Sequence, residues 1–193
     1  MTVVVATRNP DGGVNVVADS QISDDWSKLN GYPDKIWMEK DLGYVFGSSG
    51  SIRTAQVVRF ATDWPRFRED ENDLPKFAVL EFVPALKAAL ENHGLLKEKN
   101  GVESMDSEFI VAWGEHFFSI EGDFSVMMPV DGRLAIGGGY AEAYGALGDW
   151  GTWDVEDVVE AVRRASLTAR GVGGDIYFVT TEELQIRKVD LND

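Results

Sequence analysis

Residues 2–21, TVVVATRNPDGGVNVVADSQ, predict the antiparallel hairpin with which the fold begins. Residues 3–7 (VVVAT) form a compact, β-branched run of the kind found in strands. Residues 10–13 (PDGG) supply turn chemistry, and residues 14–18 (VNVVA) form a second run of the same type. The second run leads directly into Asp19, so the hairpin places a carboxylate at the end of a buried strand.

Beyond this hairpin, the pattern predicts strands and helices in alternating groups. The expected elements are strands near 36–38 and 44–46, helices over 51–64 and 79–90, strands over 109–113, 117–120 and 134–136, helices over 141–147 and from 154 onward, and a last hairpin over 175–189. Pairs of helices between groups of strands do not suit a doubly wound parallel sheet, in which single helices alternate with strands. We therefore predict an α+β fold, a four-layer αββα sandwich of two antiparallel sheets flanked by helix pairs, formed by a single domain over residues 1–193.

Composition narrows the classes of function. The chain has 33 acidic and 18 basic residues, a net charge of −15, which argues against binding to nucleic-acid backbones or to anionic membrane surfaces. There is no cysteine, so thiolate metal sites, iron–sulfur clusters and a cysteine nucleophile are excluded. Only two histidines are present, so a metal centre built from several histidines is not expected. The first residues show no basic segment followed by a long apolar one, so no signal peptide is expected. We expect a cytoplasmic protein that uses no cofactor and no metal.

Thr2 is a candidate nucleophile because it directly follows Met1. A small second residue is what methionine aminopeptidases accept, and removal of Met1 would leave a threonine with both a hydroxyl and a free α-amine. The reference pKa of such an amine is about 7.7–8.0, so near neutral pH it can act as a general base for the hydroxyl. Threonine after methionine is common, however, and an exposed strand residue is the simpler interpretation of Thr2 taken alone.

Three further residues lie where predicted strands begin or end. Asp19 closes the second strand, Lys35 opens the third, and Gly47 ends the fourth. A lysine near Thr2 would favour the alkoxide by its charge, and Asp19 would keep that lysine oriented. Gly47 would allow a backbone N–H to approach an oxyanion. A plain salt bridge between Asp19 and Lys35, and a turn that caps a helix from Ser51, are the structural alternatives.

These residues carry a family resemblance. The chain resembles proteasome β-type subunits, which are N-terminal nucleophile hydrolases, and among them the bacterial threonine peptidases that work with an ATP-dependent unfoldase. The resemblance spans nearly the whole chain in the family's order and close to its spacing. It is carried by the segments TVVVATR, ADSQ, DKIW, YVFGSSGS, LAIGGGYAEA and GDIYFVTTEEL.

The resemblance implies a role for each of these positions. Thr2 would be the nucleophile with its own amine as proton shuttle, Lys35 and Asp19 would tune the hydroxyl, and the Gly47 amide would form the oxyanion hole. Substrate would be bound by a backbone contact from Ser23 and by a specificity pocket lined by Ile22, Pro33, Trp37 and Ser51.

The resemblance also implies the reaction and the partners. Peptide bonds would be hydrolysed through an acyl-enzyme ester, with no cofactor. The chain would assemble into homo-oligomeric rings, receive unfolded polypeptide as substrate, and be fed by an AAA+ unfoldase.

One departure from the family's pattern leaves alternatives open. The family usually has a serine, which supports the amine, where this chain has Gly138. A catalytically inactive proteasome-like ring or scaffold therefore stays an alternative to the peptidase. A third possibility is an amidase of the same superfamily that acts on a small molecule, since fold-level analogy alone does not separate these functions.

Overall fold

The predicted first hairpin is present. In the computed structural model, which describes residues 2–23, 28–68, 73–149 and 151–189, strand β1 (Val4–Arg8) pairs antiparallel with β2 (Val14–Asp19). The register places Val4 opposite Ala18. Both faces of β1 are buried, because Val3 and Val5 pack toward helices while Val4 and Ala6 pack toward a second sheet. This explains why the sequence reads as a continuous apolar run rather than an alternating one.

Ten strands form two five-stranded antiparallel sheets. The first sheet has the order β12-β1-β2-β13-β14, and its remaining strands are β12 (Arg133–Ile136), β13 (Ile176–Thr180) and β14 (Arg187–Lys188). The second has the order β11-β10-β9-β6-β5, with strands β5 (Ile36–Glu39), β6 (Tyr44–Gly50), β9 (Ser107–Trp113), β10 (His116–Ile120) and β11 (Val126–Met127). The predicted mixture of antiparallel sheets and helices is confirmed.

Two short hairpins were not predicted from the sequence. They are formed by β3 (Ile22–Ser23) with β4 (Lys28–Leu29), and by β7 (Lys97–Lys99) with β8 (Val102–Ser104). Their residues are partly or fully exposed and lack the apolar alternation that marks a strand in sequence. A 3₁₀ turn, η1 (Pro33–Lys35), connects the first of these hairpins to β5; the side chain of Pro33 lies outside the described part of the chain.

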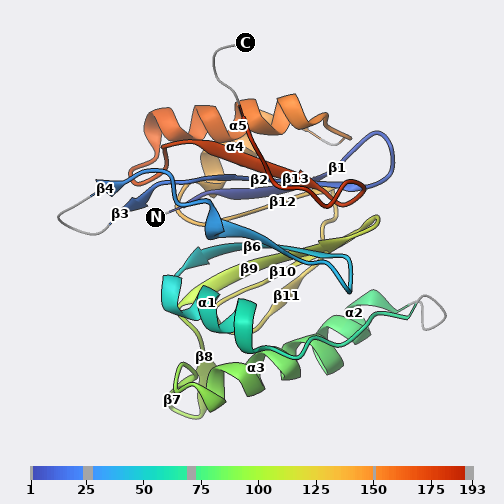
Figure 1. The fold of residues 1–193 in the computed structure, drawn as a ribbon, viewed down its shortest axis with the longest axis vertical. Helices are drawn as coiled ribbons and strands as arrows, with labels where there is room; N and C mark the ends of the chain where they lie inside the picture. The colour runs from blue at the N-terminus through green and yellow to red at the C-terminus, as the bar shows by residue number, and fades with distance from the viewer. Residues whose placement is uncertain (1, 24–27, 69–72, 150, 190–193) are drawn as a thin grey trace.

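Helices cover the outer faces of both sheets (Figure 1). The second sheet is covered by α1 (Ile52–Ala61), α2 (Leu74–Phe77), the π-helical turn η3 (Ala78–Phe82) and α3 (Val83–Asn92). The first is covered by α4 (Tyr140–Leu147) and α5 (Val155–Thr168). Asp154 caps α5 in a capping box with Asp157, as its position in the sequence predicts. No helix among these described segments is long and apolar enough to cross a membrane.

Pro84, inside the helix predicted over residues 79–90, is preceded by a π-helical turn. Proline lacks a backbone N–H and crowds the preceding turn, so a regular α-helical ladder cannot continue through it unchanged. The helix widens over η3, which ends two residues before Pro84, and continues as α3 from Val83.

Three buried clusters hold the layers together. One lies between the second sheet and helices α1 to α3, and it is rich in aromatic rings. Another lies between the first sheet and helices α4 and α5. The third lies between the two sheets, where valine, isoleucine and alanine from both sheets interdigitate.

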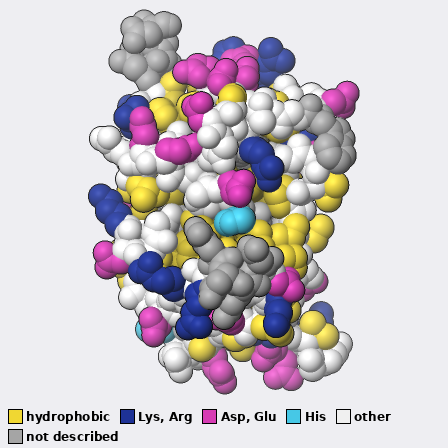
Figure 2. Space-filling view, turned by 90° about the vertical axis from the view of Figure 1, so that its right-hand side faces the viewer, with side chains coloured by type: hydrophobic (Ala, Val, Ile, Leu, Met, Phe, Trp, Pro, Cys, Tyr) yellow, Lys and Arg dark blue, Asp and Glu magenta, His cyan; other side chains and the backbone are white. Residues whose placement is uncertain are grey.

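Charge is mixed on the face that Figure 2 shows. Lys and Arg side chains are interspersed there with Asp and Glu, and hydrophobic side chains gather near the middle of the view (Figure 2). The described side chains visible on this face therefore form no continuous basic surface of the kind that tracks a nucleic-acid backbone.

The two sheets pack closely against each other at Gly47. A Cβ atom placed on Gly47 would lie 2.5 Å from Cγ1 of Val4 and 3.6 Å from Cγ1 of Val16. Real Cβ atoms do not approach other carbons so closely, so only glycine fits between β6 and the first sheet without movement of the layers.

This packing generates a stability prediction. Gly47→Ala should lower the free energy of unfolding by about 1–3 kcal/mol, because the added methyl overpacks the space between the sheets. Gly145→Ala is the matched control: Gly145 is exposed in α4 with no atom within 4 Å of an added Cβ, so this change should be neutral or stabilising by up to about 1 kcal/mol. Urea unfolding measures both values. Equal stabilities of the two variants would contradict the close approach at Gly47.

Candidate active site

Asp19 is the centre of a buried hydrogen-bond network. The residue is 1% exposed at the end of β2. Its Oδ1 accepts hydrogen bonds from the Val3 backbone N–H at 3.0 Å and from Lys35 Nζ at 2.8 Å. Its Oδ2 accepts from the backbone N–H groups of Gly173 at 2.9 Å and Gln21 at 3.2 Å. One carboxylate thus joins the start of β1, the end of β2, the turn before β5 and the loop after α5.

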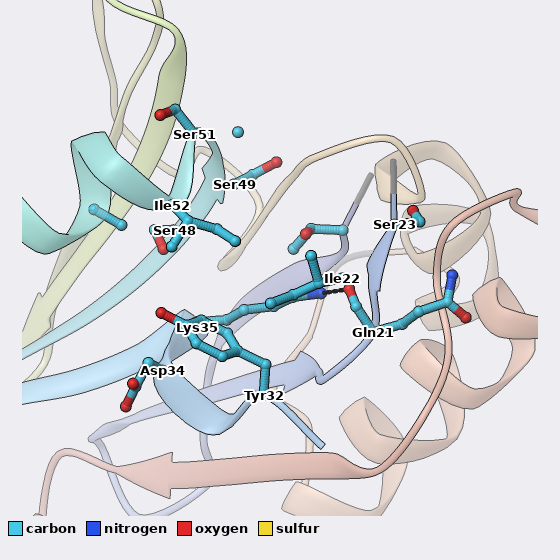
Figure 3. Close-up of a pocket in the computed structure, with 13 residues that line it drawn as sticks. Gln21, Ile22, Ser23, Tyr32, Asp34, Lys35, Ser48, Ser49, Ser51 and Ile52 are labelled. Atoms are coloured by element: carbon cyan, nitrogen blue, oxygen red, sulfur yellow. Dashed lines mark hydrogen bonds between the residues drawn. The ribbon is translucent and has the colours of Figure 1, made fainter. Parts of the chain in front are cut away.

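Lys35 is held inside the protein by this network. The residue is 6% exposed, and its Nζ also donates to the carbonyl oxygen of Gln21 at 2.6 Å, the contact drawn as a dashed line in Figure 3. Burial lowers the pKa of Lys35, while the charge of Asp19 and its hydrogen bond act in the opposite direction. The ammonium is therefore poorly hydrated, and its field acts strongly on any group that shares its cavity.

Thr2 lies in the wall of the cavity that Lys35 also lines. Thr2 is 7% exposed, and the cavity has a volume of about 360 Å³. The peptide unit between Thr2 and Val3 is held by two hydrogen bonds. Its carbonyl oxygen, Thr2 O, accepts from the Gly139 N–H at 3.2 Å, and its N–H, that of Val3, donates to Asp19. The backbone next to Thr2 is therefore held by the same carboxylate that binds Lys35.

The cavity is built from segments far apart in the sequence. Figure 3 shows residues 21–23 on one side, the end of β6 and the start of α1 on another, and Lys35 extending between them. Five of the residues predicted from the sequence line this cavity: Thr2, Ile22, Ser23, Lys35 and Ser51. Asp19 is hydrogen-bonded to Lys35 but is not part of the lining. Pro33 cannot be placed in this way, because its side chain is outside the described part.

The prediction that Gly47 ends its strand and faces the site is wrong. Strand β6 continues to Gly50, and Gly47 lies in mid-strand against Val4, outside the lining of the cavity. The pairing of β6 with β5 ends at Gly47, whereas its pairing with β9 continues to Gly50. Residues 48–50, which have no partner in β5, line the cavity. Gly50, with φ of +103°, is the strand-end glycine that lines it.

Trp37 also lies elsewhere than predicted. It is 2% exposed in the aromatic cluster under α1 to α3, stacked on Phe46 with 5.2 Å between ring centroids. A strand that opened at Lys35, as predicted, would place Lys35 and Trp37 on the same face. Lys35 instead belongs to the 3₁₀ turn η1, so strand alternation begins only at Ile36 and directs Trp37 toward the helices.

Eight further lining residues were not predicted from the sequence. They are Gln21, Tyr32, Asp34, Ser48, Ser49, Gly50, Ile52 and Ala55. A signal for part of this set was present, because residues 48–51 (SSGS) follow an apolar run and precede a helix. Ser51 is indeed the N-cap of α1, and its Oγ accepts a hydrogen bond from the Thr54 N–H at 3.2 Å.

The glycine-rich turn between β12 and α4 closes the other side of Thr2. Gly138 is exposed in this turn and brings no hydroxyl to it. Gly137, with φ of +87°, packs so closely on the Thr2 carbonyl that a Cβ would not fit, and that Cβ would also lie 2.8 Å from Ser49 Oγ. The Gly137 N–H donates to Glu108 Oε2 at 2.9 Å. A serine hydroxyl and a carboxylate thus lie beside this turn, although neither comes from the turn itself.

No metal centre is evident in this part of the molecule. Within the described ranges, no group of three or more His, Asp or Glu residues is placed to hold a metal ion. The chemistry that the site offers is that of a hydroxyl, a buried ammonium and strand-end backbone groups.

Comparisons with known proteins agree with this fold. No family model and no curated protein matches the chain. Among solved structures, BPH of Thiobacillus denitrificans in complex with epoxomicin matches with a TM-score of 0.71 at 20% identity, covering 92% of this chain and 97% of that one. HslV of Trypanosoma brucei matches with a TM-score of 0.62 at 20% identity, covering 92% and 98%. The Anbu complex of Pseudomonas aeruginosa, described as a helical assembly, matches with a TM-score of 0.67 at 14% identity, covering 99% and 88%.

These neighbours confirm the predicted resemblance at the level of the fold. They are proteasome-related N-terminal nucleophile hydrolases and the proteasome-like Anbu, and the match extends over nearly the full length of each chain. At identities of 20% or below, the likeness concerns the fold alone, so activity has to be argued from the site.

The Asp19 network generates a second stability prediction. Asp19→Asn should lower the free energy of unfolding by about 3–5 kcal/mol, because it leaves the Lys35 ammonium buried without its counter-charge. Asp34→Asn is the matched control, since Asp34 pairs with Arg59 at 2.9 Å with side chains 48% and 32% exposed, and it should cost under about 1 kcal/mol. Chemical denaturation of both variants tests this difference. A loss at Asp19 no larger than that at Asp34 would show that the network does not hold the site together.

Proposed function

We propose that the chain is an N-terminal threonine peptidase, with Thr2 as the nucleophile after removal of Met1. The observation that carries the proposal is that Thr2 and the buried Lys35 ammonium line one cavity, with Asp19 fixing both. In this proposal residues 1–193 form a single proteasome β-subunit-like domain, and the two sheets with their flanking helices are the four-layer αββα sandwich of this superfamily.

The proposed first step is acyl transfer to Thr2. The free α-amine of Thr2 takes the hydroxyl proton as Oγ1 attacks the carbonyl carbon of a peptide bond, and the C=O electron pair moves onto oxygen. Lys35 lowers the energy of the developing alkoxide through its charge. The tetrahedral intermediate then breaks its C–N bond, and the amine passes its proton to the departing nitrogen, which leaves an ester on Thr2.

The proposed second step is hydrolysis of that ester. The same amine takes a proton from water, the resulting hydroxide attacks the ester carbon, and the proton returns to Oγ1 as the acid product leaves. Two protein groups therefore act in both steps: the α-amine carries the proton, and the ammonium stabilises charge on the threonine oxygen. No cofactor enters either step.

We assign the oxyanion donor to Gly50 rather than to Gly47. Gly50 ends β6 at the edge of the cavity, where no β5 residue pairs with it. A backbone N–H at that position can approach a carbonyl oxygen held over Thr2, and glycine suits it because φ is +103°.

The lining also suits an extended peptide. Ser23 and the backbone near Gly50 offer polar groups on opposite sides of the cavity, while Ile22, Ile52 and Ala55 give it an apolar wall. This combination accepts a medium-sized apolar side chain next to a peptide backbone that is bound by polar contacts. Unfolded polypeptide is the proposed substrate.

Assembly into homo-oligomers is part of the proposal. Exposed apolar side chains on the outer helices, among them Phe60, Leu80 and Leu167, are suited to contacts with other subunits. The relative from Pseudomonas aeruginosa forms a helical assembly, and the family resemblance supports rings in the cytoplasm that are fed by an AAA+ unfoldase.

A second candidate function is a proteasome-like ring or scaffold without peptidase activity. One observation favours it: Gly138 supplies no hydroxyl where the family usually has the serine that supports the amine. The two candidates differ in a single measurable property, which is hydrolysis that depends on Thr2.

Substitution of Thr2 tests the proposal. Thr2→Ala should reduce peptide hydrolysis by a factor of about a thousand or more, because it removes the nucleophile, and should leave the oligomeric state unchanged. Thr2→Ser should keep measurable activity, since it retains a hydroxyl and an α-amine. Thr168→Ala, at the exposed end of α5, is the control and should match the unaltered protein. Hydrolysis of a casein-derived fluorogenic peptide mixture, with size-exclusion chromatography, measures both properties.

Either of two results would count against Thr2 as nucleophile. Undiminished hydrolysis by Thr2→Ala would place the reaction elsewhere. Assembly without any hydrolysis by the processed, unaltered protein would favour the scaffold.

A further inference from the structure

A second cavity adjoins the one that contains Thr2. It has a volume of about 600 Å³ and shares Ser49 and Gly50 with the first cavity. Its other walls come from the residues before β9, the first residues of β9 and the glycine-rich turn at Gly137. The two cavities therefore lie on either side of the end of β6, beside the position proposed for the reacting carbonyl.

Glu108 projects into this second cavity from β9. Ile110 packs between the two sheets, and because side chains alternate along a strand, Glu108 faces the same way at the end nearest Thr2. Glu108 lies opposite Ser49 in the register of β9 with β6. The Gly137 N–H, which donates to Oε2 at 2.9 Å, fixes the orientation of the carboxylate. The position of this carboxylate is thus set by the strand that carries it and by its hydrogen bond to the Gly137 N–H.

The Glu108 carboxylate has no cation of its own within the described chain. No ion pair of the described residues includes Glu108, and the described lining of the cavity contains no lysine or arginine. Asp106 adds a second carboxylate to the wall; its partner Lys97 lies outside the lining, and both of these side chains are more than half exposed. A partly buried carboxylate beside a substrate-sized space attracts a cationic group.

An aromatic ring stands at the rim of the same cavity. Tyr140, the first residue of α4, is 57% exposed and is part of the lining. An exposed ring beside a carboxylate suits the long stem and charged end of lysine or arginine, through apolar contact along the stem and cation–π attraction at the end.

We propose that Glu108 makes this second cavity a subsite for a lysine or arginine side chain of the peptide substrate. The inference rests on the proposed function, since it places the reacting carbonyl at Gly50 between the two cavities. A peptide in that position directs the side chain on one side of the scissile bond into the cavity of Thr2. The side chain on the other side of that bond enters the cavity of Glu108. The chain thus cuts selectively beside basic residues.

Peptide binding to the Thr2→Ala protein tests this subsite without hydrolysis. The probes are fluorescein-labelled octapeptides of alanine and leucine in which one lysine, or one glutamate, is moved through successive positions. At one position, lysine should bind about tenfold more tightly than glutamate, since one charge-assisted contact is worth about 1.4 kcal/mol. Fluorescence anisotropy at low ionic strength gives each dissociation constant.

Variants at position 108 then assign the preference to the carboxylate. Glu108→Gln keeps the shape and an oxygen for the Gly137 N–H, and it should reduce the lysine-to-glutamate ratio to about twofold or less. Glu108→Asp keeps the charge and should retain more of the preference than Glu108→Gln. Glu115→Gln is the matched control. It removes the same charge, and Glu115 lies exposed in the turn between β9 and β10. Its ratio should equal that of the parent protein.

Two results would overturn the subsite. One is the absence of any position at which lysine is favoured. The other is a lysine preference that Glu108→Gln leaves intact, which would locate its source in other charges of this acidic protein. Because binding is measured without the Thr2 hydroxyl, these results are independent of whether Thr2 is the nucleophile.

Discussion

The carboxylate of Asp19 is the group on which the rest of the site depends. Burial of a charged pair is expensive in free energy, and such a pair persists only when further hydrogen bonds satisfy its atoms. Here three backbone N–H groups and the Lys35 ammonium all converge on one side chain. The same bonds that offset its desolvation also fix the start of β1, so stability and the placement of Thr2 have one physical origin.

Local signals in the sequence were sufficient for much of the fold. The run before Asp19 identified the β1–β2 hairpin, because a strand buried on both faces reads as continuous β-branched residues. Asp154 identified the start of α5, since capping depends on neighbours in the chain. The grouping of helices between strands indicated antiparallel sheets. Each of these features is encoded within a few residues, which is why it could be predicted.

The errors arose where distant segments decide the geometry. Gly47 looked like a strand end, but the length of β6 is set by its pairing with β9, which continues to Gly50. Position 47 requires glycine because the two sheets pack closely there. This contact joins residues far apart in the chain, so the local sequence pattern does not predict it. Trp37 was misplaced because the 3₁₀ turn at Lys35 shifts the phase of strand alternation. Glu108 was not predicted as a site residue either, because its hydrogen bond to Gly137 forms only when β9 lies beside the glycine-rich turn.

In the proposed function, Thr2 becomes a free, reactive N-terminal nucleophile beside Lys35. The most direct measurement is the intact mass of the purified protein before and after treatment with an epoxyketone, which reacts with both the hydroxyl and the α-amine of an N-terminal threonine. If Thr2 is the nucleophile, the protein loses the mass of Met1 and then gains a single adduct, which peptide mapping locates at Thr2. Retention of Met1, or a free Thr2 that never forms the adduct, would contradict this proposal.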